Sequence, residues 1–255
     1  MAWHSKWHNI RHKKAVQDSK KAKIYTKIWK IIQMAAKWWD DPSLNPSLAS
    51  ALEKARYYNL PKDVINRAIQ KWAGKINSED IEEIYYEWYW PWWAALYIKS
   101  LSSNKNRSSS EIRATITSFW WSLGEPWSVS WQFEAKSYFI IIWKKEKKLD
   151  KWKEIENIKE ISYDEVEKTA ILSWADDIYE IELNTFKIIW EKNEFQNIMN
   201  FLINDNYKIV DSWIEYIPTN KMKINENEIE KLLKLIEELE DNDDVERVFT
   251  NVIYD

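Results

Sequence analysis

The sequence contains almost no glycine and no cysteine. Its 255 residues include 2 Gly and no Cys, whereas Gly usually makes up roughly 7% of a protein. Without Cys there is no disulfide framework, no thiolate nucleophile and no Cys-ligated zinc, which fits a reducing compartment. The glycine deficit is harder to explain, because tight turns need residues that adopt positive φ.

Long apolar runs are also absent. No stretch reaches about 18 apolar residues, and the first residues, MAWHSKWHNIRHKK, lack the apolar core of a signal peptide. We therefore expect a soluble, cytoplasmic protein with no membrane partner. Its 45% hydrophobic residues can supply the cores of one large domain or of two to three small ones.

Charge is divided unevenly along the chain. Residues 1–75 contain 16 Lys and Arg against 5 Asp and Glu, a net charge of +11, while the remaining residues carry a net charge of −15. A basic first part on an acidic remainder suggests that the N-terminal part meets a polyanion.

Hydrophobic periodicity predicts an α+β protein. Residues 9–37 repeat apolar residues every three or four positions, a second helix follows with Asn45 as N-cap and Pro46 at its first position, and a third begins near Pro61. These helices make up a predicted domain one, residues 1–76.

From residue 81 the period changes to two. Residues 81–133 and 207–254 predict one antiparallel sheet with two helices on one face, which is domain two (77–133 plus 206–255). Residues 134–205 predict a second α/β set inserted into it, domain three. The segment KKEKKLDKWKEIENIKE, residues 144–160, predicts an exposed hairpin or loop rather than a basic binding site.

The strongest candidate site is the basic segment Lys6 to Lys30, with nine Lys or Arg and one acid, Asp18. A solvated helix face is the ordinary interpretation of such a run. Its charge density and interleaved aromatic and polar residues favour a nucleic-acid surface. The candidate contacts are Lys6, Trp7, Arg11, His12, Lys13, Lys14, Gln17, Lys20, Lys21 and Lys23.

Other chemistry is poorly supported. His4, His8 and His12 share a helical spacing of four, but the neighbouring cations would repel a metal ion, so we predict no metal site. There is no nucleotide-binding loop and no recognisable set of nucleophile, base and orienting group. The acids of EELEDNDD, residues 237–244, predict a helix end and a solvated loop. We expect no enzyme and no cofactor.

Several segments together resemble the YebC/PmpR family of transcriptional regulatory proteins, which includes a mitochondrial translational activator. They are HSKW near the N-terminus, QD at 17–18, YNLPKDVINRAIQKWAG, NKNRSSSEIR, SLGEPWSVSWQF and LLKLIEELEDNDDVERVFTNV. The resemblance implies a helical bundle followed by two ferredoxin-like α/β domains, one inserted in the other. It adds Asn106, Arg107 and Arg113 as weaker nucleic-acid candidates.

The departures from the family concern tryptophan. Where the family has glycine, this chain has Trp at twelve positions, namely 3, 38, 39, 72, 88, 90, 92, 93, 120, 121, 127 and 174. Our hypothesis is that the gene uses UGA for glycine and that UGA has been translated as tryptophan. The alternative is a real aromatic surface that stacks bases or sugars, centred on EWYWPWWA, residues 87–94.

The sequence leaves three functions open. The family name implies a DNA-binding transcriptional regulator, although the basic arm has no helix-turn-helix signature. The mitochondrial relatives imply a ribosome-associated translation factor that binds ribosomal or messenger RNA. A third function is a protein-interaction scaffold that uses the acidic second half.

Overall fold

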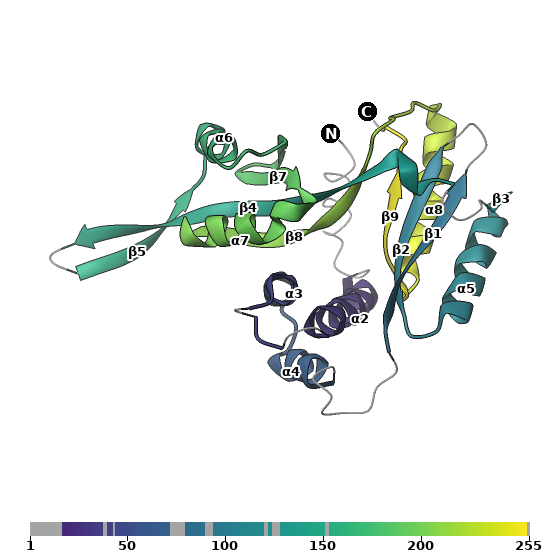
Figure 1. The fold of residues 1–255 in the computed structure, drawn as a ribbon, viewed down its shortest axis with the longest axis horizontal. Coiled ribbons are helices and arrows are strands. Elements are labelled where there is room, and N and C mark those ends of the chain that lie inside the picture. Colours follow the sequence, from purple (N-terminus) through teal and green to yellow (C-terminus); the bar gives the residue numbers. More distant parts are fainter. Residues whose placement is uncertain are drawn as a thin grey trace.

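A helical domain comes first, and two mixed units, each with its own sheet, follow it (Figure 1). The computed structural model describes residues 17–37, 40–42, 44–71, 80–89, 94–119, 122–123, 128–150 and 153–253. It describes the backbone alone for residues 17–21, 46, 122–123, 147–150 and 153–156. The architecture is of the α+β class, as predicted.

Three helices form the N-terminal domain: α2 (Gln17–Ala36), α3 (Pro46–Tyr57) and α4 (Lys62–Gln70). The start of α3 is confirmed, because the Asn45 side chain accepts a hydrogen bond from the Leu48 amide at 3.1 Å. Pro46 fills the first helical position, where an N–H would lack a partner in any case. The three apolar faces meet in one core, which includes Ile28, Ile32, Leu48, Ala55 and Ala68.

The first sheet is antiparallel, with strand order β3-β1-β2-β9. Its strands are β1 (Glu82–Tyr89), β2 (Ala95–Ser102), β3 (Ser122–Leu123) and β9 (Val245–Thr250). The helices α5 (Lys105–Ser118) and α8 (Glu226–Asp241) lie side by side on one face (Figure 1). Leu96 and Ile98 of β2 pack there against Ile112 and Leu235, as predicted for two helices on one sheet.

The second sheet is built around one long strand. Its strands are β4 (Phe133–Asp150), β5 (Lys153–Glu160), β6 (Asp177–Glu182), β7 (Thr185–Glu191) and β8 (Tyr207–Pro218). Their order is β5-β4-β7-β6, and β8 also pairs with β4. The helices α6 (Tyr163–Leu172) and α7 (Phe195–Asn204) supply the apolar side chains that cover one face. Beyond that face, β4 and β5 continue as a projecting hairpin, so the hairpin predicted for residues 144–160 is present (Figure 1).

The structure differs from the sequence prediction at two strands. Residues 207–218 join the second sheet through β4 and not the first sheet, where we expected them. The chain enters the insertion through β4 and leaves it through β8. Because the first residue of β4, Phe133, pairs with the last residue of β8, Pro218, the two strands bring the ends of the insertion together next to the first sheet. Residues 130–132, at the end of a segment that we expected to belong to the first sheet, form the 3₁₀ helix η3 (Ser130–Gln132). A second 3₁₀ helix, η4, spans Lys192–Glu194.

Trp174 occupies a position that glycine normally fills. The amide of Ala175 donates to Ala170 O at 2.9 Å, and the amide of Trp174 donates to Ile171 O at 3.3 Å, so the end of α6 has the hydrogen bonds of a Schellman motif. Trp174 has φ 57° and its side chain is 90% exposed. The corresponding residues after α3 and α7 are Asn59 and Asn206, which tolerate positive φ, whereas Trp does not. The geometry favours glycine at this position.

Trp88 does not offer a stacking surface. Its side chain is only 3% exposed within the core between the first sheet and its helices, and no described residue accepts a hydrogen bond from its indole nitrogen. An unpaired buried donor costs about 1–3 kcal/mol, so this position too is unfavourable for Trp. The other ten positions of the set lie outside the described residues.

The N-terminal domain contacts both sheets. On the second sheet, α3 packs against β8, where the Ser50 hydroxyl donates to Ser212 O at 2.6 Å and Lys54 lies 3.2 Å from Asp211. Towards the first sheet, α2 meets the turn between α8 and β9.

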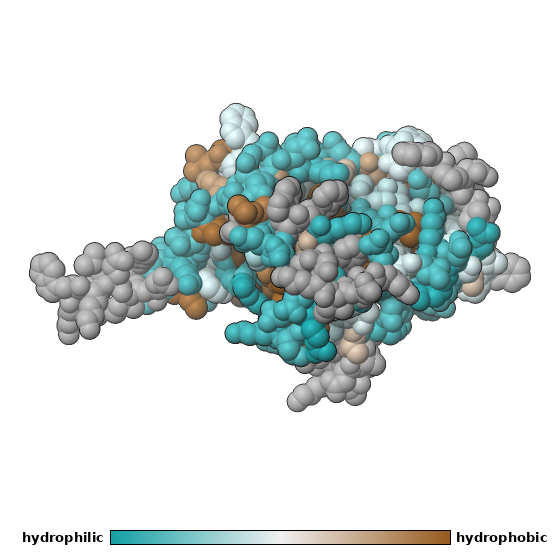
Figure 2. Space-filling view, turned by 60° about the horizontal axis from the view of Figure 1, so that its bottom comes forward, coloured by the Kyte–Doolittle hydropathy of each residue, from teal (hydrophilic) through white to brown (hydrophobic). Residues whose placement is uncertain are grey.

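Figure 2 shows the molecule turned so that the bottom of Figure 1 comes forward. The described part of this face is mainly hydrophilic, and its hydrophobic residues form small separate groups.

Candidate nucleic-acid interface

The predicted contact residues divide into those outside the described residues, those described by backbone alone and those described in full. Lys6, Trp7, Arg11, His12, Lys13 and Lys14 lie outside the described residues. Gln17, Lys20 and Lys21 belong to the first turns of α2, of which the backbone alone is described. Lys23 is described in full, and so are Lys27 and Lys30, the last two lysines of the basic segment.

Three lysines of α2 face an acidic turn. Lys23, Lys27 and Lys30 are spaced by four and three residues, which places them on one side of the helix. We call residues 240–244 at the end of α8 the acidic turn. Lys23 Nζ lies 3.2 Å from a carboxylate oxygen of Asp241, Lys27 donates to the Glu240 carbonyl, and Lys30 donates to Asp243 O at 2.8 Å and to Asp244 Oδ1 at 2.6 Å.

These contacts become more buried along α2. Lys23 and Asp241 keep 41% and 54% of their side-chain surfaces exposed, whereas Lys30 and Asp244 keep 12% and 3%. Burial lowers the pKa of Lys27 and raises that of Glu240, so both groups are shifted towards their neutral forms. Lys27 and Lys30 are therefore parts of a domain contact, and Lys23 lies at its solvent edge.

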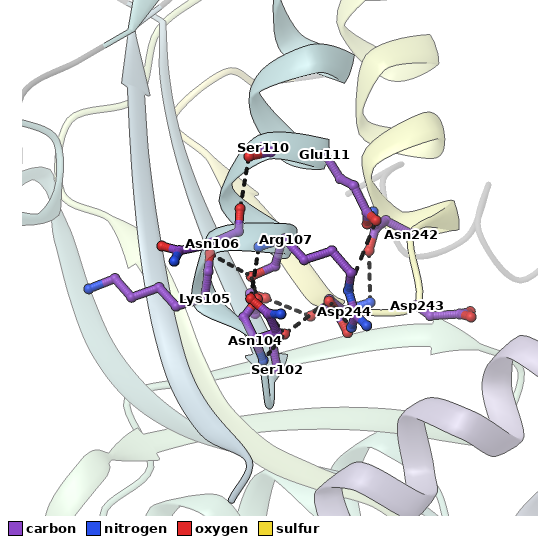
Figure 3. Close-up of polar contacts among 12 residues, drawn as sticks. Ser102, Asn104, Lys105, Asn106, Arg107, Ser110, Glu111, Asn242, Asp243 and Asp244 are labelled. Carbon is purple, nitrogen blue, oxygen red and sulfur yellow. Dashed lines mark hydrogen bonds and ion pairs between the residues drawn. The ribbon is translucent and has the colours of Figure 1, made fainter. Parts of the chain in front are cut away.

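Asp244 joins three parts of the chain. Its Oδ2 accepts hydrogen bonds from Arg107 at 2.7 Å and from Ser102 at 3.0 Å (Figure 3). Its Oδ1 accepts a hydrogen bond from Lys30. Burial would raise the pKa of Asp244, but the hydrogen bonds from Lys30 and Arg107 outweigh it and hold the pKa below its usual value. The carboxylate therefore stays charged and connects α2 with α5 and β2.

The start of α5 fixes the direction of Arg107. The Asn104 side chain caps the helix by accepting from the Arg107 amide at 3.1 Å. The guanidinium then reaches Asp244, and Glu111 lies one turn further along the same side at 4.0 Å. Of the three weaker candidates, Arg107 is thus engaged within the molecule.

Asn106 and Arg113 lie on another side of α5. They line an open hollow together with Ser109, Ser110, Ala114, Thr117 and Ser118. Figure 3 shows the Asn106 side chain directed away from Asp244. Arg113 is exposed and forms no ion pair with any described residue. We call these seven lining residues the α5 row. The row offers one cation, one amide and several hydroxyls, and it contains no acid.

Sequence reasoning missed the acidic turn. We predicted a solvated loop there, and its exposed members Asp241 and Asp243 fit that prediction, but Glu240 and Asp244 contact α2. The signals that could have found it are the spacing of Lys23, Lys27 and Lys30 and the opposite net charges of the two parts of the chain.

The described residues contain neither a membrane-spanning helix nor a metal-binding cluster. No helix within the described ranges has the length and apolar character that crossing a membrane requires. In the same ranges no group of three or more His, Asp or Glu side chains is placed to hold a metal ion. The three His residues lie outside those ranges.

Comparison with known proteins identifies the family. A model of the TACO1/YebC protein N-terminal domain matches residues 5–75, and a model of the TACO1/YebC second and third domain matches residues 81–252. A probable transcriptional regulatory protein of Thermoanaerobacter pseudethanolicus is 38% identical over 253 residues, which cover 99% of this chain and 97% of the relative. One from Listeria innocua is 37% identical over 253 residues, 98% of each chain.

A solved structure has the same fold. The crystal structure of a conserved hypothetical protein from Aquifex aeolicus superposes with a TM-score of 0.80 at 30% identity, covering 96% of this chain and 95% of that one. The sequence motifs, the family models and the superposition agree over nearly the whole length. The chain therefore belongs to the TACO1/YebC family.

Proposed function

We propose that the protein is a DNA-binding transcriptional regulator that holds nucleic-acid phosphates with its N-terminal domain and catalyses no reaction. The observation that carries this proposal is the charge division, with a net +11 in residues 1–75 against −15 in the rest. The relatives from Thermoanaerobacter and Listeria are named probable transcriptional regulatory proteins, which supports the same function.

The phosphate contacts are assigned to the start of the basic segment. Lys27 and Lys30 are engaged with the acidic turn. The cations of the basic segment left for phosphate are therefore Lys6, Arg11, Lys13, Lys14, Lys20, Lys21 and, in part, Lys23. Neutralising six phosphates gives a slope of about −5 in a plot of log affinity against log salt. Binding of this kind weakens steeply as salt is added.

The helix α4 supplies groups that could read a duplex. A four-residue connection, residues 58–61, joins α3 to α4, a length typical of helix-turn-helix units. The exposed side of α4 carries Lys62, Asn66, Arg67 and Gln70, of which Arg67 is paired with Asp63 at 2.6 Å. Amide and cationic side chains of these types contact base edges and phosphates.

An RNA target at the ribosome is the second candidate, and the row on α5 favours it. Hydroxyl and amide groups beside Arg113 match the 2′-hydroxyls and phosphates that an RNA surface displays. In this case the protein acts as a translation factor that binds ribosomal or messenger RNA. The N-terminal cations serve phosphate contact equally well for RNA and for DNA.

Binding to the two targets should be measured side by side. The full chain, made with glycine at the twelve positions, is titrated with labelled genomic duplex fragments and sedimented with ribosomes at several salt concentrations. Tight, sequence-dependent duplex binding supports transcription, and ribosome association supports translation. Binding to neither contradicts a nucleic-acid function and leaves a protein-interaction scaffold.

A matched pair of variants tests the site. Lys13→Gln with Lys14→Gln should weaken binding and reduce the salt slope by about 2. Lys231→Gln with Lys234→Gln removes the same charge from the exposed side of α8 and should leave the slope unchanged. Equal effects of the two pairs would show that net charge, and not the N-terminal segment, controls binding.

A further inference from the structure

We infer that the acidic turn is an internal competitor for nucleic acid, with Asp241 occupying Lys23 until a phosphate displaces it. The inference rests on the proposed function, because it concerns regulation of the same basic segment. Its structural basis is the pair Lys23 and Asp241. These oppositely charged residues are far apart in sequence, and the fold brings them together at the solvent edge of the contact between α2 and the acidic turn.

The burial of the three lysines selects Lys23 as the exchangeable one. Lys30 donates to the buried Asp244 as well as to Asp243 O, and Lys27 donates to the Glu240 carbonyl. Loss of the Lys30 contact would take a cation from the buried Asp244 carboxylate, and loss of the Lys27 contact would take a hydrogen bond from the Glu240 carbonyl. Lys23 and Asp241 are each about half exposed at 3.2 Å, and such exposed pairs contribute about 0.2–1 kcal/mol. An external phosphate can therefore replace this carboxylate at little cost.

The end of α8 explains why an acid there seeks a cation. The partial negative charge of a helix dipole lies at the C-terminus, where acids are unfavourable and cations are stabilising. α8 has no basic residue in its last turn and ends at Asp241. The lysines of α2 supply the missing positive charge from another domain. Asp241 and a phosphate are both negatively charged, so both are attracted to the lysines of α2.

Competition of this kind limits weak, unselective binding. While Asp241 occupies Lys23, a nucleic acid gains one phosphate contact only by breaking an internal one. A target that also engages the rest of the basic segment can make the exchange, whereas a poor target gains less. Removing the competitor should strengthen binding most at low salt, where phosphate contacts count most.

The test uses Asp241→Asn with Glu226→Gln as its control. Both residues are exposed acids of α8, and both variants change the net charge by the same amount. They stand at opposite ends of a 16-residue helix, about 22 Å apart along its axis, which exceeds the screening length of about 10 Å at 0.1 M salt. The probes are a labelled mixed-sequence DNA duplex and a labelled single-stranded RNA, followed by fluorescence anisotropy at 50 to 200 mM salt.

Asp241→Asn should bind the probes about two- to fivefold more tightly than the unchanged protein at low salt, and Glu226→Gln should not. In a Lys23→Gln background the gain from Asp241→Asn should vanish, because the cation that it frees is gone. Thermal melting of each variant checks that the fold is intact.

The outcomes separate the two proposals. If the unchanged protein binds neither probe, the proposed function fails and this inference fails with it. If it binds and the gain is absent, is equalled by Glu226→Gln, or persists without Lys23, the competition is wrong while the proposed function stands.

Discussion

Lys30 of the N-terminal domain and Asp244 beside the first sheet form a buried ion pair, with Nζ 2.6 Å from Oδ1. Arg107 of α5 approaches the second carboxylate oxygen at 2.7 Å. One carboxylate therefore holds two helices that are separate in sequence, and it fixes how the basic helix α2 lies against the rest of the molecule.

Lys30→Gln should lower the free energy of unfolding by about 1–3 kcal/mol, because it removes one of two cations from a buried carboxylate. Lys23→Gln removes the same charge from the exposed pair of the same helix and should cost less than about 0.5 kcal/mol. Urea unfolding of the two variants measures the difference. Equal losses would mean that the Lys30–Asp244 contact adds nothing beyond surface charge.

The docking of α2 should weaken in acid. The pKa of Asp244 lies below its ordinary value because the hydrogen bonds from Lys30 and Arg107 outweigh the effect of burial. A depressed folded-state pKa gives stability above the unfolded value of about 3.9, and this stability is lost as pH falls through the folded-state pKa.

Asp244→Asn removes the titrating group and isolates its contribution. The variant should be less stable than the unchanged protein at pH 7, and the gap between them should narrow below about pH 4. Thermal midpoints from pH 3 to 7 measure both curves. Because Asp211 and Glu246 also have lowered pKa values, both proteins still lose stability in acid, and parallel curves would exclude a role for Asp244.

Two arginines of α5 should behave differently on substitution. Arg113 lines the open hollow and pairs with no described residue, so Arg113→Gln should leave the melting temperature unchanged. If the row binds phosphate, the same change should reduce the salt slope of nucleic-acid binding by about 1. Arg107→Gln should instead lower the melting temperature, because Asp244 loses a hydrogen bond. An unchanged salt slope in Arg113→Gln would remove α5 from the interface.

Local signals in the sequence predicted local structure well. The side chain of Asn45 caps α3 and Pro46 takes its first position, as the residue types predict. Apolar repeats predict the helices that cover the sheets. The pairing of β8 with β4 could not be derived in this way, because strand partners are chosen by contacts distant in sequence.

The acidic turn shows the same limit for the site. The contact between Lys27 and Glu240 joins residues 213 positions apart. Charge counts led us to expect an external polyanion for the basic part of the chain, and no periodicity says which lysine meets which acid within the molecule. The structure distinguishes Lys27 and Lys30, which lie within the domain contact, from Lys23, which lies at its solvent edge.

Trp174→Gly should stabilise the protein, although it removes a large side chain. The residue holds φ 57° at the end of α6 and its indole is almost wholly exposed, so its loss forfeits little packing. Relief of the left-handed conformation should gain about 1 kcal/mol or slightly more. Trp131→Gly is the control, since Trp131 is also exposed but has no positive φ and donates from Nε1 to Ser128 O at 2.8 Å.

The control should lose stability where Trp174→Gly gains it. Thermal melting of both variants decides the matter, and a loss in Trp174→Gly would contradict a glycine site at this turn.

The codons show independently whether glycine or tryptophan belongs at these positions. UGA at position 174 and at the other eleven positions supports glycine throughout, whereas UGG there would mean that the chain tolerates Trp in a left-handed turn and would restore the aromatic surface as an explanation.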